Sequence, residues 1–385
     1  MAIIILAVSE SMTKMKVIFV VALCLSVVWA FPSVKDAAEE CNSDVCGDGC
    51  RCCSNQSPLE LDKTPQLISL TWDEAVVENL FQSYWSDILM RENPDGEPIG
   101  ATFFVPHEYT DYSRVNALYN FGYEIGVHSI SKNYDQKYWR EGSLDTLKSE
   151  FEGQKEIISK FANIPPEDII GARTPQLQLN GNVSIQAYQS AELKYDSSWP
   201  TLPNQPLFPY TLDYLSTQQC TVTAKCPNEP FKGFWILPIV DLTTKDGGAC
   251  NSLGECGQNG TKTEILSWLE SEVSRVKKTK VPLTIRITSL WFEQVKDSFG
   301  AFLEFLNNLK EDKDIFLVSQ KQVYEWIQNP VEISEFKTDT PIRTQACNKV
   351  TCRLEKTADE IRYMNSCVAC PDVYPWLGNP EGKSK

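Results

Sequence analysis

The sequence contains little histidine and little basic charge. Its 385 residues include two histidines, His107 and His128, so one chain cannot assemble a centre that needs three histidine side chains. Lysine and arginine together number 36, against 51 aspartates and glutamates, and the formal net charge is −15. No basic stripe is present to neutralise phosphates, which excludes nucleic acid as a partner.

Long apolar runs are missing after the N-terminus. There, Met15-Lys16 precedes an apolar run at 17–29, and this pattern predicts a secretory signal peptide over 1–30, cleaved after Ala30, with Met1 or Met15 as the start. The alternative is a membrane anchor. It is disfavoured because the run is short for a bilayer and no later segment is long and apolar enough. We expect a secreted, extracellular protein.

Cysteine usage agrees with export. Cys24 leaves with the signal peptide, and the other thirteen cysteines cluster at 41–53, 220–226, 250–256 and 347–370. An oxidising compartment favours disulfides, so we expect two local loops closed by the middle pairs. The terminal clusters pair with each other or internally, and the spacing does not decide between them. Thirteen is odd, so one thiol is free or intermolecular.

Two further patterns concern the surface and the tail. Asn55, Asn182 and Asn259 each begin an Asn-x-Ser/Thr sequon, which is typical of glycosylated surface loops. Cys367-Val-Ala-Cys370 has the spacing of zinc ligands, but a disulfide is the favoured interpretation in an exported chain.

Short buried strands alternate with amphipathic helices along most of the chain. Apolar stripes at 144–161 and 299–309 predict helices, and Thr261 with Glu264 forms a capping box before a third stripe that ends at Val276. Alternating strands and helices indicate a mostly parallel sheet, closed or nearly closed into a barrel. The expected strands are 67–72, 101–105, 123–130, 169–172, 193–195, 234–242, 281–287 and 315–318.

The barrel is expected over 65–330. A cysteine-rich segment, 31–64, precedes it, and 331–385 is expected to be an extended, cysteine-bearing wrap and tail. In such barrels, chemistry is located on the loops after the strands' carboxyl ends. Those positions carry Asp73-Glu74, His128 and Arg173, a combination that resembles a hydrolytic metal site.

The chain resembles the chitin deacetylases of carbohydrate esterase family 4, and most closely the arthropod gut group that lacks separate chitin-binding modules. The resemblance implies a distorted (β/α)7–8 barrel, zinc or a similar divalent metal, and chitin or another N-acetylglucosamine polymer as the partner. Beyond the strand ends, it rests on Thr64-Pro65-Gln66, 104–110, Tyr210-Thr-Leu-Asp-Tyr214 and the loop from Cys220 to Cys226.

The resemblance also implies roles for single residues. Asp73 matches the general base, and Arg173 matches the arginine that orients this base, with Pro175 as its neighbour. Glu74 stands where the family has a metal-binding aspartate. His128 matches the first of two metal-binding histidines in a His-Ser-x-x-His motif.

Two family residues are replaced. Lys132 stands at the second metal histidine, and Thr288 aligns with the histidine that serves as general acid. A lysine is protonated at pH 7, since its reference pKa is about 10.4, and it then has no lone pair for zinc. We therefore expect the metal to be absent or weakly bound, with Lys132 bridging to Asp73 or Glu74 in its place.

Aromatic residues flank these motifs. Trp72, Tyr195, Trp199 and Trp291, together with Pro175, are candidates for contact with sugar rings. The alternative is that they pack in the core, as most of the ten tryptophans should.

Plainer interpretations exist for the charged residues too. Asp73 and Glu74 could be solvated loop charges, His128 could be a hydrogen-bonded core group, and Arg173 could be an ordinary ion-pair partner of Asp73.

Three functions follow from these patterns. The favoured one is a non-catalytic, chitin-binding scaffold in a gut lining or cuticle. The second is an active metal-dependent deacetylase that hydrolyses the acetamide C–N bond at a rebuilt site. The third is a structural secreted protein without a glycan ligand.

Overall fold

Strand β1 (Gln66–Trp72) is the first strand of the main sheet in the computed structural model, which describes residues 41, 46–222 and 225–384. Every residue of β1 is buried, as expected for a strand of a parallel sheet with both faces covered. It pairs in parallel with β2, β12 and β13. The expected signal peptide, 1–30, lies outside the described residues.

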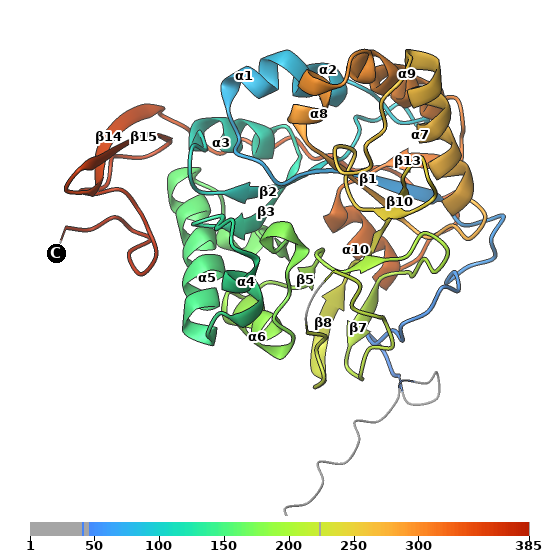
Figure 1. Cartoon of the computed structure of the whole chain (residues 1–385), viewed down its shortest axis with the longest axis horizontal. Helices are drawn as coiled ribbons and strands as arrows, with labels where there is room; N and C mark the ends of the chain where they lie inside the picture. Colours follow the sequence, from blue (N-terminus) through green and yellow to red (C-terminus); the bar gives the residue numbers. More distant parts are fainter. Residues whose placement is uncertain (1–40, 42–45, 223–224, 385) are drawn as a thin grey trace, which may run out of the picture. The chain divides into compact units, whose positions relative to one another are not determined.

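The main sheet has nine strands in the order β12-β1-β2-β3-β4-β5-β8-β7, with β13 beside β1 (Figure 1). All pairings are parallel except that of β7 with β8. A small parallel pair, β6 (Pro200–Thr201) with β9 (Ile239–Val240), lies against β12. The expected fold class, a distorted α/β barrel, is confirmed. The other strands are β2 (Thr102–Pro106), β3 (Glu124–Ser129), β4 (Gly171–Ala172), β5 (Tyr195–Asp196), β7 (Tyr210–Leu212), β8 (Phe231–Ile236), β12 (Leu283–Ile287) and β13 (Ile315–Leu317).

Helices cover the sheet, and their ends carry the expected caps. The predicted capping box is confirmed, since the Thr261 hydroxyl and the Glu264 carboxylate exchange hydrogen bonds with each other's main-chain N–H groups at the start of α7. Helix α5 begins after Ser143, whose hydroxyl accepts from Thr146 N. The helices are α1 (Glu78–Leu80), α2 (Ser86–Leu89), α3 (Tyr112–Asn120), α4 (Gln136–Glu141), α5 (Leu144–Phe161), α6 (Asn182–Ser190), α7 (Lys262–Val276), α8 (Ser289–Gln294), α9 (Ser298–Lys310) and α10 (Gln320–Gln328).

The structure differs from the sequence prediction in two places. The expected single strand over 234–242 is interrupted at Pro238, which has no N–H for a ladder, and the chain continues as β9 and as β10 (Leu242–Thr243), which pairs with β11 (Ala249–Cys250). The tail also holds an antiparallel hairpin, β14 (Val350–Thr357) with β15 (Glu360–Ser366), that was not predicted. Figure 1 shows this hairpin beside α3.

Six disulfides tie the described residues, and Cys53 is a free thiol. The two predicted local loops are confirmed, and the terminal clusters pair internally. The zinc interpretation of the Cys367-Val-Ala-Cys370 motif is wrong, because both sulfurs are bonded to other cysteines. The pairs are Cys41–Cys52, Cys46–Cys50, Cys220–Cys226, Cys250–Cys256, Cys347–Cys367 and Cys352–Cys370.

A search of the described part of the chain for a helix long and apolar enough to cross a bilayer finds none. Those residues all belong to one compact unit, Ala38–Lys385.

Candidate functional site

The candidate site lies at the carboxyl ends of β1, β3, β4 and β12. Asp73 and Glu74 follow β1 directly, His128 is the second-last residue of β3, and Arg173 follows β4. Because parallel strands end at the same edge of a barrel, their terminal side chains converge. His128 Nδ1 lies 2.8 Å from the carbonyl oxygen of Arg173, and both residues interact electrostatically with Asp73, so the structure brings these predicted residues together.

Asp73 is paired with an arginine that the sequence did not single out. Arg286 Nη2, from β12, donates to Asp73 Oδ2 at 3.0 Å, and the Asp73 residue is 8% exposed. Burial alone would raise the pKa of Asp73, but Arg286, with His128, Arg173 and Lys132 behind it, holds that pKa well below its ordinary value. Asp73 is therefore a buried, permanently ionised carboxylate, and not a solvated loop charge.

Glu74 points to a different partner. Its carboxylate accepts from the main-chain N–H of Ser289 at 3.1 Å and from the Ser289 hydroxyl. Burial raises the pKa of Glu74 to about 7, and the hydrogen bonds from Ser289 oppose this only in part. The two neighbouring acids thus differ: Asp73 stays charged, whereas Glu74 can hold a proton near neutral pH.

His128 is buried and neutral. Its Nδ1 lies 2.8 Å from the carbonyl oxygen of Arg173, and a carbonyl only accepts, so the proton of the imidazole is on Nδ1 and the lone pair is on Nε2. Burial lowers the pKa of His128 to about 3, although the nearby Asp73 raises it. His128 is therefore a hydrogen-bonded core group that ties the end of β3 to Arg173.

Arg173 does not pair with Asp73 directly. Its guanidinium donates to Ser197 O at 2.8 Å, to Ser197 Oγ at 3.0 Å and to Thr71 Oγ1 at 2.7 Å, and it lies over the ring of Phe104. Burial lowers the pKa of Arg173 to about 9, while Asp73 raises it. The arginine thus fastens β1 to the loop after β5 and acts on Asp73 through its charge alone.

Lys132 is held close to the acids by its own loop. Its Nζ donates to the main-chain carbonyl of Asp73 at 2.6 Å, so the expected bridge to a carboxylate is replaced by a bond to the backbone. The backbone of Lys132 is in the left-handed region, with a φ of 45°. The buried carboxylate of Glu150 fixes the preceding part of the loop, because it accepts from the N–H groups of Ile130 and Ser131 at 2.9 Å each. The ammonium still acts on the charge of Asp73.

Thr288 occupies the N-cap of α8 but makes no capping hydrogen bond with its side chain. Its hydroxyl faces Gly254, since a Cβ added at Gly254 would lie 2.8 Å from Thr288 Oγ1. A threonine hydroxyl has no pKa near neutrality, so nothing at this position can serve as the general acid.

The aromatic residues expected at the sugar are inside the core. Trp72, Tyr195, Trp199 and Trp291 are all buried, and so is Pro175 in a short 3₁₀ turn, Pro175–Leu177. Three of them use their polar atoms internally: Tyr195 OH donates to Glu124, Trp199 Nε1 donates to Gln219 O and Trp291 Nε1 donates to Gln258 O. In this structure they present no ring face to a ligand, because the rings are packed against other core residues.

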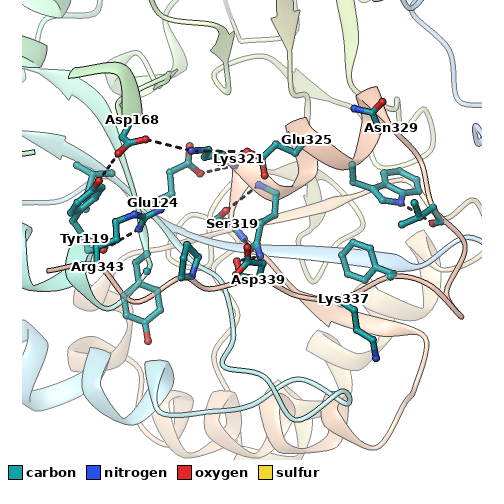
Figure 2. A pocket seen from close by; sticks show the side chains of 18 of the residues that line it. Tyr119, Glu124, Asp168, Ser319, Lys321, Glu325, Asn329, Lys337, Asp339 and Arg343 are labelled. Carbon is teal, nitrogen blue, oxygen red and sulfur yellow. Dashed lines mark hydrogen bonds and ion pairs between the residues drawn. The ribbon is translucent and has the colours of Figure 1, made fainter. Parts of the chain in front are cut away.

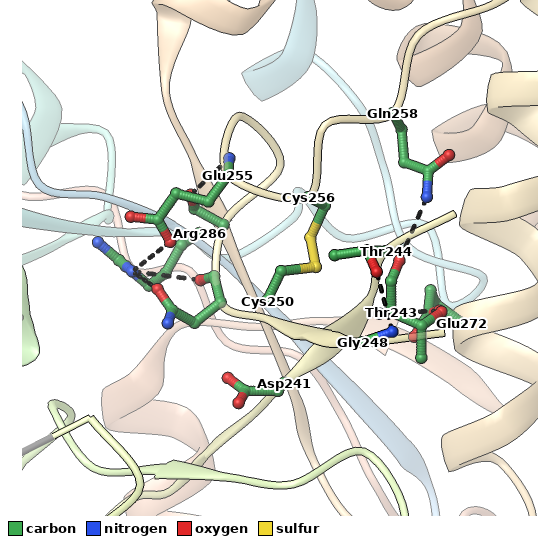
Figure 3. Close-up of a disulfide and its surroundings, with 12 residues drawn as sticks. Asp241, Thr243, Thr244, Gly248, Cys250, Glu255, Cys256, Gln258, Glu272 and Arg286 are labelled. Carbon is green, nitrogen blue, oxygen red and sulfur yellow. Dashed lines mark hydrogen bonds and ion pairs between the residues drawn. A yellow bond between two sulfur atoms is a disulfide. The ribbon is translucent and has the colours of Figure 1, made fainter. Parts of the chain in front are cut away.

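Arg286 and Asp241 are the residues that sequence reasoning missed. Arg286 lies in a buried strand of otherwise apolar or small residues, and an arginine at such a place was the signal that could have found it. Its Nη1 also donates to Asn251 O at 3.3 Å. Figure 3 shows Asp241 and Arg286 near the loop closed by Cys250–Cys256. Asp241 is 3% exposed, and its Oδ1 has no hydrogen-bond partner among the described residues.

The side chains at this strand end do not bring three metal-ligand atoms together in the described part of the chain. Among the described residues, the only three histidine, cysteine, aspartate or glutamate ligand atoms that lie within 4.8 Å of one another belong to cysteines engaged in disulfides. Asp73 is occupied by Arg286, Glu74 by Ser289, and three cationic side chains act on Asp73. A divalent cation at this strand end would find too few free ligand atoms, and the neighbouring positive charges would repel it.

A cavity of about 550 Å³ lies at the amino end of β3, away from Asp73 (Figure 2). Some of its charged groups have partners there: Lys321 Nζ lies 3.9 Å from Asp168 Oδ1 and 4.0 Å from Glu325 Oε1, and Arg343 Nη1 donates to the main-chain carbonyl of Tyr119. In barrels of this kind, residues at the amino ends of the strands serve stability, and we place the site at the other end.

Comparison with known proteins identifies close sequence relatives. The chain is 33% identical to Chitin deacetylase 8 of Bombyx mori over 386 aligned positions, which cover 96% of this chain and 100% of the relative. It is 29% identical to Chitin deacetylase 1 of Bombyx mori, over 90% of this chain and 69% of that protein.

No family model matches the chain. Among solved structures, the catalytic domain of peptidoglycan N-acetylglucosamine deacetylase from Eubacterium rectale aligns with a TM-score of 0.39 and 12% identity, over 74% of this chain and 97% of that one.

Proposed function

Because the chain belongs to the chitin deacetylase family, we propose that it is an extracellular, chitin-binding protein in which deacetylase catalysis is weak or lost. The relatives' names supply the ligand class, a polymer of N-acetylglucosamine. The disulfides of the described residues support an oxidising compartment. In this proposal residues 1–30 are a signal peptide, the sequons carry glycans, and the matrix is a gut lining or cuticle.

The pairing of Asp73 with Arg286 is the observation that carries the proposal. A general base works best when its pKa lies near the operating pH and its lone pair is free to take a proton. Asp73 has neither property, because Arg286 occupies Oδ2 and the surrounding cations hold its pKa far below neutrality. It would accept a proton from water only weakly.

The second half of the reaction lacks its proton donor. The departing amine must be protonated, and general acid catalysis contributes about 10²–10⁴-fold in rate. Thr288 cannot supply this proton, and His128 cannot replace it, since burial keeps the pKa of that imidazole at about 3. Loss of the base, the acid and the metal donors together should leave little turnover.

An active deacetylase with a rebuilt site is the second candidate, and Glu74 is the observation that favours it. With its pKa raised to about 7 by burial, Glu74 is partly protonated at neutral pH and could donate this proton. Measured turnover decides between the two candidates.

We expect the purified protein to release almost no acetate from N-acetylglucosamine oligomers, with or without added zinc or cobalt. The physical reason is the loss of base, acid and metal donors at one strand end. Acetate release over time is the measurement, with Asp73→Asn and Glu74→Gln as matched variants. Turnover that Glu74→Gln abolishes would establish the rebuilt enzyme and contradict the proposal.

Added zinc should leave the melting temperature of the wild-type protein unchanged. The variant Lys132→His/Glu74→Asp/Arg286→Ala restores ligands and removes a cation, so it should gain zinc-dependent stability of about 2.7 kcal/mol when free zinc is 100-fold above Kd. Thermal melts with zinc or chelator measure this. The control variant carries Lys137→His in place of Lys132→His, on an exposed position of the helix α4 that follows the loop. A zinc-induced rise in the wild type would contradict the expectation.

A further inference from the structure

Two exposed tyrosines line a groove at the same end of the barrel as Asp73. Tyr109 follows the carboxyl end of β2, Tyr363 lies on β15, and each is 67% exposed. The groove has a volume of about 370 Å³. It is lined by Val77, Glu78, Tyr109, Thr110, Asp111, Thr351, Tyr363, Met364 and Asn365.

The groove adjoins the strand end that carries Asp73. Val77 and Glu78 belong to the segment that continues directly from Asp73 and Glu74. That segment is fastened to the loop after β2, because Asp111 N donates to Val76 O at 2.8 Å. A linear polymer lying in the groove can therefore run toward the site described above.

The hairpin that forms one wall is firmly docked. Glu108 Oε1 accepts from Lys356 Nζ at 2.9 Å and from Arg362 Nη2 at 3.0 Å. Asp111 Oδ2 accepts from Asn365 Nδ2 at 2.7 Å. Tyr363 is consequently held at a fixed place opposite the loop of Tyr109, and the groove exists before any ligand arrives.

Tyr109 is held outward by an uncommon backbone conformation. Its φ is 68°, in the left-handed region, which is an outlier for a bulky residue and belongs to glycine or asparagine in most turns. The turn closes through Thr110 N, which donates to His107 O at 3.2 Å. Strain of this kind persists where the surrounding structure enforces it, and it clusters at ligand clamps.

The groove suits a neutral ligand. Its acids are already paired with basic side chains: Glu78 with Arg114, and Asp111 with Lys349 at 3.2 Å. What remains is two amphipathic aromatic rings with hydroxyl and amide groups beside them. An N-acetylglucosamine chain matches this chemistry, since its apolar ring faces can stack on tyrosine while its hydroxyl and acetamide groups form hydrogen bonds.

We propose that the groove between Tyr109 and Tyr363 is the site at which this protein holds a neutral N-acetylglucosamine polymer. The inference rests on the proposed function for its ligand class and gives that ligand a location. The residues proposed to contact sugar are now the exposed Tyr109 and Tyr363, because the tryptophans first expected there are buried.

The test is a binding isotherm on colloidal chitin for the full chain and three variants. Tyr109→Ala/Tyr363→Ala should bind at least about tenfold more weakly, a loss equivalent to about 1.4 kcal/mol shared by two rings. Phe121→Ala, which removes another exposed ring, 55% accessible, from the end of α3, should bind like the wild type. Tyr109→Gly should weaken binding without lowering the melting temperature, because glycine accepts the positive φ and misfolding cannot then explain the loss.

The outcomes separate the two proposals. Unchanged binding of the double variant beside a wild type that binds would overturn the groove and leave the proposed function standing. A wild type that chitin does not retain would overturn the proposed function itself. A dimer in sedimentation that Tyr109→Ala dissolves would assign the groove to a second copy of the chain, and would also overturn the inference.

Discussion

Replacing Arg286 with alanine should lower the free energy of unfolding by about 3–5 kcal/mol, because the change leaves the buried carboxylate of Asp73 without its ion-pair partner. Both side chains are close to fully buried, at 8% and 11% exposure. The bonds from Arg286 to Asn251 are lost as well. Denaturant unfolding near pH 7 measures the effect.

Two comparisons identify the cause. Adding Asp73→Asn to Arg286→Ala should recover much of the loss, since a neutral amide is cheaper to bury than an unpaired carboxylate. Lys262→Ala breaks an exposed pair with Glu304, and should cost less than about 1 kcal/mol. A loss under about 1 kcal/mol for Arg286→Ala, or no recovery in the double variant, would show that the pair is not the main support of Asp73.

The general plan of the fold was predictable from local patterns. Continuous apolar runs such as that of β1 are typical of strands covered on both faces, and Thr261 with Glu264 marks a helix start through two specific hydrogen bonds. The hairpin of β14 and β15 was missed because its turn lacks the Asn-Gly or Asp-Gly pair that announces a short loop.

The site was predictable only as far as strand ends determine it. Asp73, His128 and Arg173 converge because parallel strands end together, and that follows from chain order. The pairing of Asp73 with Arg286 depends on which strand lies beside β1, and 213 positions separate the two residues. Whether an aromatic faces water or core likewise depends on tertiary packing. Trp199, expected at the sugar, is therefore buried, whereas the exposed Tyr109 was not singled out.

The same dependence on packing makes Asp241 an unusual acid. Its carboxyl group is buried, and Oδ1 lacks a partner among the described residues. Burial raises the pKa of Asp241 to about 7. Arg286 and Arg275 lower this pKa, and Glu255 raises it further. An unfolded aspartate has a pKa of about 3.9. Between these two values the folded state keeps a proton that the unfolded state has lost, so this group's contribution to stability is present below about pH 4 and is lost as the pH rises to 7.

The stability advantage of Asp241→Asn over the wild type should therefore grow by about 2–3 kcal/mol between pH 5 and pH 8. The comparison with the wild type at each pH is essential. His107 and His128, whose pKa values burial lowers to about 3, make both proteins lose stability as the pH falls below about 6.5, and this trend cancels in the difference. Asp246→Asn, on an exposed turn, serves as the control and should give the same small difference at both pH values. If the advantage of Asp241→Asn does not grow between pH 5 and pH 8, Asp241 is ionised in the folded protein at both, and Arg286 must then serve two carboxylates.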